Sequence, residues 1–154
     1  MTHRTIIDSP VGPLTLVERD GALVRLSFGA YGADEPATPL LARAAEQLRE
    51  YFAGERREFD LPLAPRGTEF QLACWRALTE IPYGETRSYG EQAARIGRPD
   101  RARAVGAANG ANPIAIIQPC HRVIGADGSL VGFGGGLETK RRLLDLEAGI
   151  LTLI

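Results

Sequence analysis

The chain has 154 residues, of which 44% are hydrophobic and 24% charged, and a formal net charge of −1. This size and composition predict a soluble globular protein of one ordinary domain or two small ones, and the near-neutral charge argues against a protein that binds polyanions over its whole surface. The longest apolar run, Ile114 to Ile117, is too short to cross a bilayer, and the N-terminus lacks a signal-peptide pattern, so we expect a cytoplasmic location and no membrane partner.

Cysteine and histidine residues are few, which limits the metal and redox chemistry that the sequence can support. Cys74 and Cys120 are far apart, and neither forms a CxxC motif. A structural zinc needs about four ligands, and His3 and His121 have no metal-ligand spacing. The glycine-rich segment 132–136 lacks the spacing and the lysine of a phosphate-binding loop. We therefore expect two free thiols, no metal and no cofactor.

The N-terminal third predicts a small antiparallel sheet followed by one helix. RTIID, LTLVE and ALVRLSF are predicted strands between residues 4 and 28, with Asp20-Gly21 as a two-residue hairpin turn. After a polar loop, segment 39–54 has the spacing of an amphipathic helix that ends at a glycine. Its predicted apolar face consists of Leu41, Ala44, Ala45, Leu48 and Phe52. This helix packed on the sheet completes a first module, which segment 61–67 links to the rest.

A second helix is predicted to begin after Thr68. The Thr68 hydroxyl and the Gln71 side chain are spaced as a capping box, in which each side chain bonds a backbone N–H at the helix start. Cys74 lies in the apolar stripe of this helix, so we expect it to be a buried structural residue.

Two short helices follow, joined by a turn that contains glycine. Ser88 and Glu91 form another capping box, Gly97-Arg98-Pro99 breaks the helix, and Asp100 is predicted to cap the next one, at about 101–109. This is a helix-turn-helix pattern, which occurs in DNA-binding proteins and also in purely structural helical hairpins.

Charge is unevenly distributed along the chain. The first third is rich in acidic residues, whereas between residues 84 and 142 basic residues outnumber acidic ones by nine to five. We therefore expect an anionic partner to bind the C-terminal part. The nine basic residues are Arg87, Arg95, Arg98, Arg101, Arg103, Arg122, Lys140, Arg141 and Arg142.

The C-terminal third predicts an extended segment and a final helix. Residues 114–123 are expected to run extended and to be followed by a turn at 126–128 and the glycine cluster. The last helix, 137–149, is predicted to direct Leu137, Leu143, Leu144 and Leu146 inward.

Cys120 is followed directly by an imidazole and a guanidinium. The thiolate is the nucleophilic form of cysteine, so a reactive Cys120 needs a neighbour such as His121 or Arg122 that takes its proton or favours the anion. On an extended strand adjacent side chains point to opposite faces, so His121 reaches Cys120 only if the chain bends at Pro119 or a water bridges them. Glu147 is a candidate to orient the imidazole, and the alternative is a solvated residue at a helix end. Sequence patterning alone leaves Cys120 as either a nucleophile or a buried apolar residue.

The run NPIAIIQPCHRVIGADGSLVGFGGGLETKRRLLDLE resembles the active-site region of the O6-alkylguanine-DNA alkyltransferases, whose hallmark is PCHR preceded by Asn-Pro. Similarity extends back through ARAVGAANG and IPYGETRSYGEQAARIG to IIDSPVGPLTL, and so covers nearly the whole chain. The resemblance implies an α+β fold. Residues 1–65 would form a ribonuclease H-like sheet and helix with a structural role, and residues 66–154 a mostly helical, winged-helix-like domain that binds DNA and transfers the alkyl group.

The resemblance also implies a role for each residue of the reaction. Cys120 attacks the alkyl group on guanine O6 and keeps it as a thioether, so each molecule reacts once. His121 acts as base through a water, and Glu147 orients His121. Tyr89 donates a proton or hydrogen bond to the departing guanine, and Asn112 is a hinge between recognition helix and active site.

The implied partner is double-stranded DNA that contains O6-alkylguanine, with O4-alkylthymine as a second substrate. The protein would act as a monomer that can cluster cooperatively on DNA. Its helix-turn-helix would bind the minor groove, with Arg103 inserted in place of the flipped nucleotide. The other implied DNA-binding residues are Tyr89, Arg101, Ala104, Gly106 and Arg122, and the implied pocket residues are Val123, Phe133, Gly134 and Gly135.

Two positions depart from the family pattern. Gln118 stands where the family usually has an apolar residue, so we expect it to find a hydrogen bond or face an edge. Phe133 replaces a frequent tyrosine, which leaves the range of accepted alkyl groups open. Two rival functions also stay open, a non-catalytic lesion-binding protein on the same scaffold and a cysteine-histidine hydrolase.

Overall fold

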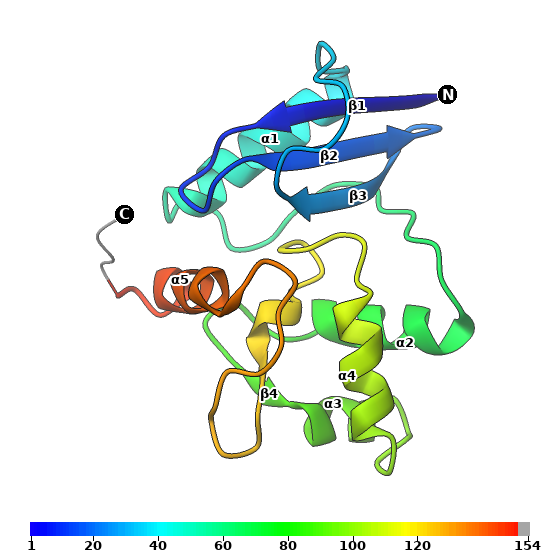
Figure 1. Cartoon of the computed structure of the whole chain (residues 1–154), viewed down its shortest axis with the longest axis vertical. Helices are drawn as coiled ribbons and strands as arrows, with labels where there is room; N and C mark the ends of the chain where they lie inside the picture. The colour runs from blue at the N-terminus through cyan, green and yellow to red at the C-terminus, as the bar shows by residue number, and fades with distance from the viewer. Residues whose placement is uncertain (151–154) are drawn as a thin grey trace. The chain divides into compact units, whose positions relative to one another are not determined.

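The structure, a computed structural model, describes residues 1–150 and divides them into two compact units (Figure 1). The first unit contains residues 1–66 and 113–115, and the second contains residues 67–112 and 116–150. A three-stranded antiparallel sheet is followed along the chain by helices, so the predicted α+β fold is confirmed. The last four residues of the predicted second domain, 151–154, lie outside the described residues.

The sheet of the first unit has the order β1-β2-β3, with strands β1 (Thr2–Ile7), β2 (Leu14–Arg19) and β3 (Ala22–Phe28). The predicted hairpin turn is confirmed, since Asp20 and Gly21 both have positive φ, at 51° and 82°. This conformation belongs to the type I′ turn, whose twist matches that of the two strands it joins.

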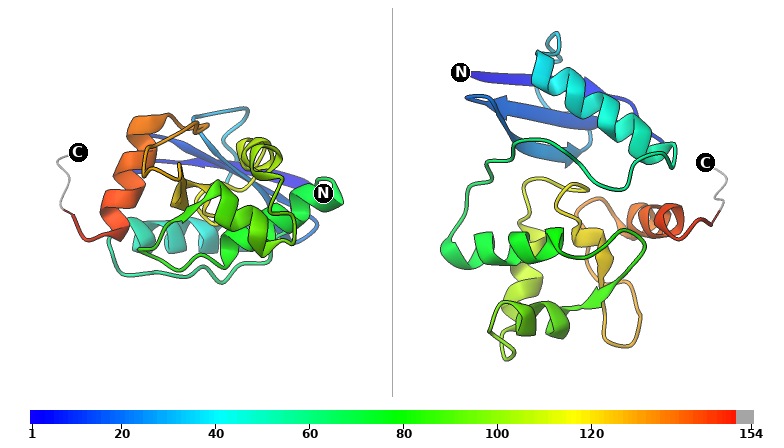
Figure 2. Two further views of the ribbon diagram at one scale, coloured as in Figure 1. Left: turned by 90° about the horizontal axis from the view of Figure 1, so that it is seen from below. Right: turned by 180° about the vertical axis from the view of Figure 1, so that it is seen from behind.

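Helix α1 (Pro39–Phe52) packs against all three strands and covers one face of the sheet (Figure 2). Its buried face differs from the predicted one, because Ala45 and Phe52 are only partly buried and Gln47 and Tyr51 take part instead. Gln47 can be buried because its amide donates to the Asp60 carbonyl at 3.1 Å and accepts from the Asp60 N–H at 2.9 Å.

Residues 113–115 pair with β3, but the predicted extended segment 114–123 does not continue beyond them. The Leu26 N–H donates to the Pro113 carbonyl at 2.9 Å, and the Ala115 N–H donates to the Leu26 carbonyl at 3.1 Å. Ile116 then has a φ of 70°. A short 3-10 helix, η1 (Cys120–Arg122), replaces the strand. The prediction was wrong because proline at position 119 has no N–H for a strand ladder and the Gln118 carbonyl closes a turn by accepting the Cys120 N–H at 2.8 Å.

The second unit contains α2 (Glu69–Thr79), α3 (Tyr89–Arg95) and α4 (Ala102–Gly110), which pack against one another. Both predicted capping boxes are present, and α3 and α4 form the helix-turn-helix. The predicted cap of α4 is wrong, since Arg101 rather than Asp100 occupies the cap position and makes no side-chain cap bond. The Arg101 N–H instead donates to the Arg98 carbonyl at 2.9 Å. The turn between α3 and α4 therefore includes Arg101, and α4 begins one residue later than predicted.

The core of the second unit consists mainly of apolar side chains from α2, α3 and α4. Cys74 is fully buried in it, as predicted, and burial raises the pKa of its thiol. The Trp75 indole N–H donates to the Ala108 carbonyl at 2.9 Å and so ties α2 to α4.

Strand β4 (Arg87–Ser88) pairs in parallel with β5 (Val123–Ile124), and α5 (Leu137–Glu147) closes the unit. The predicted inward face of α5 needs correction. Leu143 is buried, Leu144 and Leu146 are partly buried, and Leu137 is 49% exposed. The other buried residues of α5 are Lys140 and Glu147. No helix within residues 1–150 is long and apolar enough to cross a membrane.

Candidate active site

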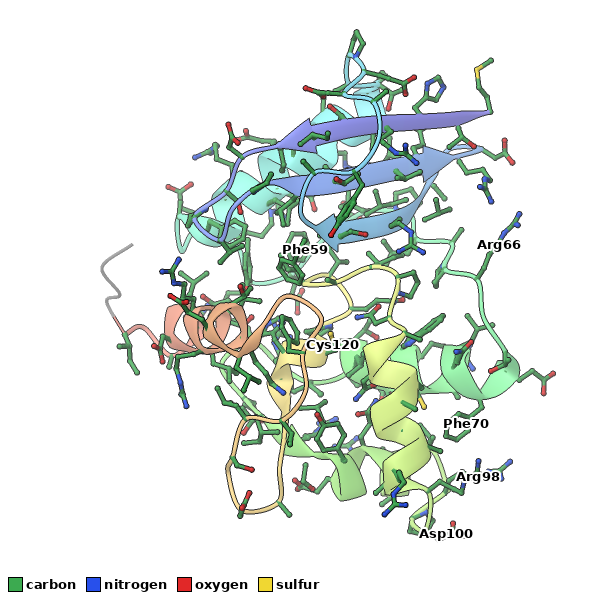
Figure 3. All side chains as sticks on the ribbon, viewed as in Figure 1. Phe59, Arg66, Phe70, Arg98, Asp100 and Cys120 are labelled. Carbon is green, nitrogen blue, oxygen red and sulfur yellow. The ribbon has the colours of Figure 1, made fainter. Side chains whose placement is uncertain are left out.

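Cys120 is the first residue of η1 and lies in the view of Figure 3 between α4 and α5. It is partly exposed and borders a cavity of about 350 Å³. The turn between α3 and α4, with Arg98 and Asp100, lies at the other end of the same unit in that figure. The cavity is lined by Tyr89, Gly106, Asn109, Gly110, Cys120, Val131, Gly132, Phe133 and Gly134.

The 3-10 turn carries His121 and Arg122 into the interior, where both contact Glu147. The His121 Nε2 atom lies 2.6 Å from Glu147 Oε2. The Arg122 guanidinium donates to both carboxylate oxygens, at 2.7 and 3.1 Å, and to the Ile81 carbonyl at 2.6 Å. The Glu147 side chain is only 1% exposed, so the solvated helix-end alternative is wrong. A buried charge needs such partners, because desolvation without them is very costly.

The carboxylate of Glu147 stays ionised and thereby determines which nitrogen of His121 carries the proton. Burial alone raises the pKa of Glu147, but the hydrogen bonds from His121 and Arg122 and the positive charge of the Arg122 guanidinium outweigh it and lower the pKa to about 2. An ionised carboxylate only accepts hydrogen bonds. The His121 Nε2 must therefore be the protonated nitrogen, and Nδ1 carries the lone pair.

The imidazole of His121 is poised to accept a proton. Burial lowers its pKa more than the neighbouring Glu147 raises it, so His121 is neutral at neutral pH. Its Nδ1 atom is buried and has no hydrogen-bond partner among residues 1–150. His121 directly follows Cys120 in the chain. It is therefore a base in a fixed orientation, with a lone pair on Nδ1 that can accept a proton.

Cys120 is a thiol rather than a thiolate at rest. Burial raises its pKa, and this effect exceeds the lowering by a hydrogen bond from the Asn112 side chain and by the charge of Lys140. A nucleophilic reaction at Cys120 therefore requires a base, which His121 can supply.

Lys140 belongs to the site, although the sequence indicated it only as one of nine basic residues between positions 84 and 142. It is fully buried, its ammonium donates to the Val131 carbonyl at 3.0 Å, and it lies 5.9 Å from the Phe133 ring centre. It therefore holds the loop that forms one wall of the cavity and brings a positive charge near Cys120. The signal in the sequence was its place three residues from Leu143 in an otherwise apolar stripe.

Tyr89 and Asn112 lie where each can act on Cys120 or the cavity. The Tyr89 hydroxyl donates to the Val131 carbonyl at 3.3 Å. Burial raises the pKa of Tyr89, and so does the negative charge of Cys120 once that thiol ionises. Asn112 bonds Gln118 in both directions. The expectation that buried Gln118 finds a hydrogen bond is therefore confirmed.

The implied DNA-binding residues fall into two groups. Arg103 and Arg101 are exposed on or beside α4, and Arg101 lies 5.2 Å above the Phe70 ring. No hydrogen bond or ion pair from residues 1–150 holds the Arg103 side chain. Arg122 differs, because it is 6% exposed and bound to Glu147, which argues against a DNA contact.

The remaining implied residues differ in their relation to the cavity. Phe133 and Gly134 line it, whereas Val123 is fully buried in the core and, like Gly135, is outside the lining. Gly106 borders the cavity beside Tyr89, since a side-chain carbon added there would lie 3.6 Å from the tyrosine ring. Ala104, on the same helix, is partly buried.

Comparisons with known proteins agree along both units. Residues 2–65 match the family model of the ribonuclease-like domain of 6-O-methylguanine DNA methyltransferase, and residues 69–149 match the model of its DNA binding domain. The chain is 56% identical over 154 residues to a methylated-DNA–protein-cysteine methyltransferase of Mycobacterium bovis, with 96% of this chain and 93% of the relative covered.

Solved structures give the same result. The crystal structure of Mycobacterium tuberculosis O6-methylguanine methyltransferase matches with a TM-score of 0.88 and 53% identity, over 99% of this chain and 96% of the other. The crystal structure of Mycobacterium tuberculosis OGT in complex with DNA matches with a TM-score of 0.89 and 55% identity, over 96% and 93% of the two chains.

Proposed function

Because the chain belongs to the 6-O-methylguanine DNA methyltransferase family, we propose that Cys120 is the residue that accepts the alkyl group from O6-alkylguanine in duplex DNA. The enzyme repairs methylated DNA by direct transfer to one of its own cysteines. The observation that carries the assignment is the position of Cys120 at the cavity, directly before a neutral histidine that Glu147 anchors. Cys74, the other cysteine, is fully buried in the core.

The proposed reaction is an in-line displacement without cofactor. The proton of the Cys120 thiol passes through one water to Nδ1 of His121. The sulfur then forms a bond to the alkyl carbon while the bond from that carbon to O6 breaks. The guanine leaves as an anion, and the Tyr89 hydroxyl, a phenol that is protonated at neutral pH, donates a proton or hydrogen bond to it. The proton that His121 took from Cys120 then restores the phenol or neutralises the released base, so charge and protons balance. The thioether product has no route back to the thiol, so each molecule reacts once.

The target carbon lies inside the duplex, so the nucleotide must rotate out of the stack into the cavity beside Cys120. We propose that α4 enters the minor groove and that Arg103 fills the vacated space. Its exposed guanidinium, with no partner within residues 1–150, supports this role. Small residues along the helix, such as Ala104 and Gly106, suit close approach to a groove.

We also propose a division of labour between the two domains. Residues 1–65 have a structural role, and residues 66–154 bind DNA and transfer the alkyl group. All side chains of the proposed reaction belong to the second unit. The further proposals are O4-alkylthymine as a second substrate, action as a monomer that can cluster on DNA, and a cytoplasmic location.

The test of the proposed function is to incubate the protein with a duplex that carries one O6-methylguanine and to analyse its peptides by mass spectrometry. We expect one methyl group on the peptide that contains Cys120, and none on the peptide that contains Cys74. Tight binding of the lesion with both peptides unmodified would instead support a non-catalytic lesion-binding protein. Turnover of a small ester or amide without DNA would support a hydrolase.

Arg103→Ala is expected to slow repair of duplex DNA while free O6-alkylguanine base reacts as before. Without the guanidinium, the DNA conformation with the nucleotide flipped out loses a stabilising group. Unstacking a base costs a few kcal/mol, so the rate of methyl transfer from duplex DNA should fall about 10- to 100-fold. The measurement is the rate of methyl transfer from duplex and from free base. Arg76→Ala, which removes an exposed arginine from α2, controls for the loss of one charge. An equal loss with both substrates would contradict the role of Arg103.

A further inference from the structure

We propose that Gln118 is a positioning residue that holds the Asn112 amide with its NH₂ group toward Cys120, so that Asn112 donates a hydrogen bond to the sulfur. The inference rests on the proposed role of Cys120 as alkyl acceptor. Gln118 departs from the pattern of the family. Two hydrogen bonds join it to Asn112, one from side chain to side chain and one from the Asn112 side chain to the Gln118 main chain.

The two bonds determine the orientation of the Asn112 amide. Asn112 Nδ2 donates to the Gln118 main-chain carbonyl at 2.8 Å, and Gln118 Nε2 donates to Asn112 Oδ1 at 2.7 Å. A carbonyl oxygen only accepts hydrogen bonds, and the NH₂ group of Gln118 only donates them. A flipped Asn112 would place oxygen against oxygen at one contact and NH₂ against NH₂ at the other. The Gln118 side chain therefore adds a second constraint to the one that the main chain imposes.

This orientation leaves one N–H of Asn112 for Cys120. An amide NH₂ group has two donors, and the Gln118 carbonyl uses one of them. The hydrogen bond from the Asn112 side chain favours the charged form of Cys120 and lowers the pKa of the thiol. Gln118 is only 4% exposed, so solvent cannot readily replace its bond to Asn112.

Several charged or titratable groups face Cys120 from the surrounding elements. Tyr89 approaches from α3 and Lys140 from α5, and both interact with the negative charge that the sulfur acquires when the thiol ionises. His121 follows Cys120 in η1 and is bound to Glu147. Within residues 1–150, none of these four is hydrogen-bonded to Gln118, and none needs to move when Gln118 is replaced by a residue of similar shape. A change in the titration of Cys120 in such a variant therefore reports on Asn112.

A purely structural role is the alternative that the experiment must exclude. Ile116 has a φ of 70°, which is strained for a β-branched residue and persists only when its surroundings enforce it. Asn112 and Gln118 lie on either side of Ile116, so their hydrogen bonds could serve only to stabilise this turn. In that case replacing Gln118 would lower stability and leave the titration of Cys120 unchanged.

The experiment measures the rate of alkylation of Cys120 by iodoacetamide as a function of pH, in the full chain and without DNA. Peptide mass spectrometry separates Cys120 from Cys74. Gln118→Met keeps the approximate shape and removes the donor, and we expect the apparent pKa of Cys120 to rise by about one unit and the rate at pH 7 to fall about tenfold. The rate at high pH should match that of the unchanged protein.

Two further variants make the test specific. Gln118→Glu places a carboxylate, which only accepts, against Asn112 Oδ1, and should raise the apparent pKa of Cys120 more than Gln118→Met does. Gln47→Met removes an amide that is similarly buried, at 5% exposure, but lies in the first unit, and should leave the pH profile unchanged. An unshifted profile in Gln118→Met, or a lower plateau without a shift, would overturn the proposal.

A measurement on the unchanged protein covers the case in which the Gln118 variants do not fold. The side-chain NH₂ resonances of Asn112 and Gln118 can be followed by NMR while Cys120 is titrated. We expect the Asn112 resonance to move with the ionisation of Cys120 and the Gln118 amide protons to exchange slowly. If the chemical shift of the Asn112 NH₂ group does not change as Cys120 ionises, the proposal is refuted. Methyl transfer to Cys120 from damaged duplex would remain intact in that case, so the two failures are distinguishable.

Discussion

Replacing Cys120 by serine is expected to abolish methyl transfer and to leave DNA binding intact. Serine has nearly the same shape, but its hydroxyl is a far weaker nucleophile than a thiolate and holds its proton more tightly. The thiol proton is also much more acidic than the hydroxyl proton, so the neutral His121 activates cysteine far more readily than serine. DNA affinity should persist because Cys120 lies at the cavity, whereas the proposed contacts come from α4. The measurements are radiolabelled methyl transfer and a gel-shift titration with damaged duplex.

Cys74→Ser is the matched control for this substitution. It removes the other thiol of the chain, from the core of the second unit, where burial raises the pKa of Cys74. A buried hydroxyl without a partner should cost about 1 to 3 kcal/mol of stability, while transfer by the folded fraction stays at its usual level. Residual transfer in Cys120→Ser, or loss of transfer only in Cys74→Ser, would show that the acceptor is misassigned.

The parts of the fold that local chemistry determines were predictable from the sequence. The two capping boxes and the Asp20-Gly21 turn depend on residues within a few positions of one another, and the structure confirms them. The segment before Cys120 was predicted wrongly because the prediction followed its apolar residues and not its proline and amide side chains. Its apolar residues favour a strand, but Pro119 and the bonds of Gln118 close a turn that local propensity does not encode.

The site shows the same division between local and tertiary determinants. Cys120, His121 and Glu147 could be named as candidates because nucleophile chemistry requires a base and an orienting acid, and the family resemblance implied their roles. The place of Arg122 and Lys140 could not, because a basic side chain in a sequence indicates a charged surface unless its partner is known. Burial reverses that interpretation, since Arg122 neutralises Glu147 and Lys140 bonds the loop at the cavity wall. These two cations belong to the interior of the site.

Glu147→Gln is expected to be the most damaging change of charge in the second unit. The amide has the shape of the carboxylate but leaves the buried Arg122 guanidinium without a counter-ion, which should destabilise the protein by about 3 to 5 kcal/mol. It also ceases to fix the tautomer of His121, because an amide can either donate to Nε2 or accept from it. Transfer by the folded fraction should therefore fall by about 100-fold or more, as expected when a general base is disoriented. The measurements are denaturant unfolding and single-turnover transfer.

The destabilisation should depend on pH in a definite direction. The pKa of Glu147 is lowered from 4.5 to about 2 in the folded protein. A carboxyl with a lowered folded pKa stabilises the fold above its unfolded pKa and loses that contribution as the pH falls through its folded value. The stability difference between the unchanged protein and Glu147→Gln should therefore be constant near neutrality and shrink between about pH 4.5 and pH 2.

Two further variants separate the structural role of Glu147 from its role at His121. Glu138→Gln removes an exposed carboxylate that pairs with the partly buried Arg142 at 2.9 Å on the same helix, and should cost less than about 1 kcal/mol. Combining Glu147→Gln with Arg122→Met removes the uncompensated buried charge, so much of the lost stability should return. Transfer should stay low in the double variant, because His121 still lacks the carboxylate that orients it. Recovery of transfer together with stability would mean that Glu147 serves the fold alone.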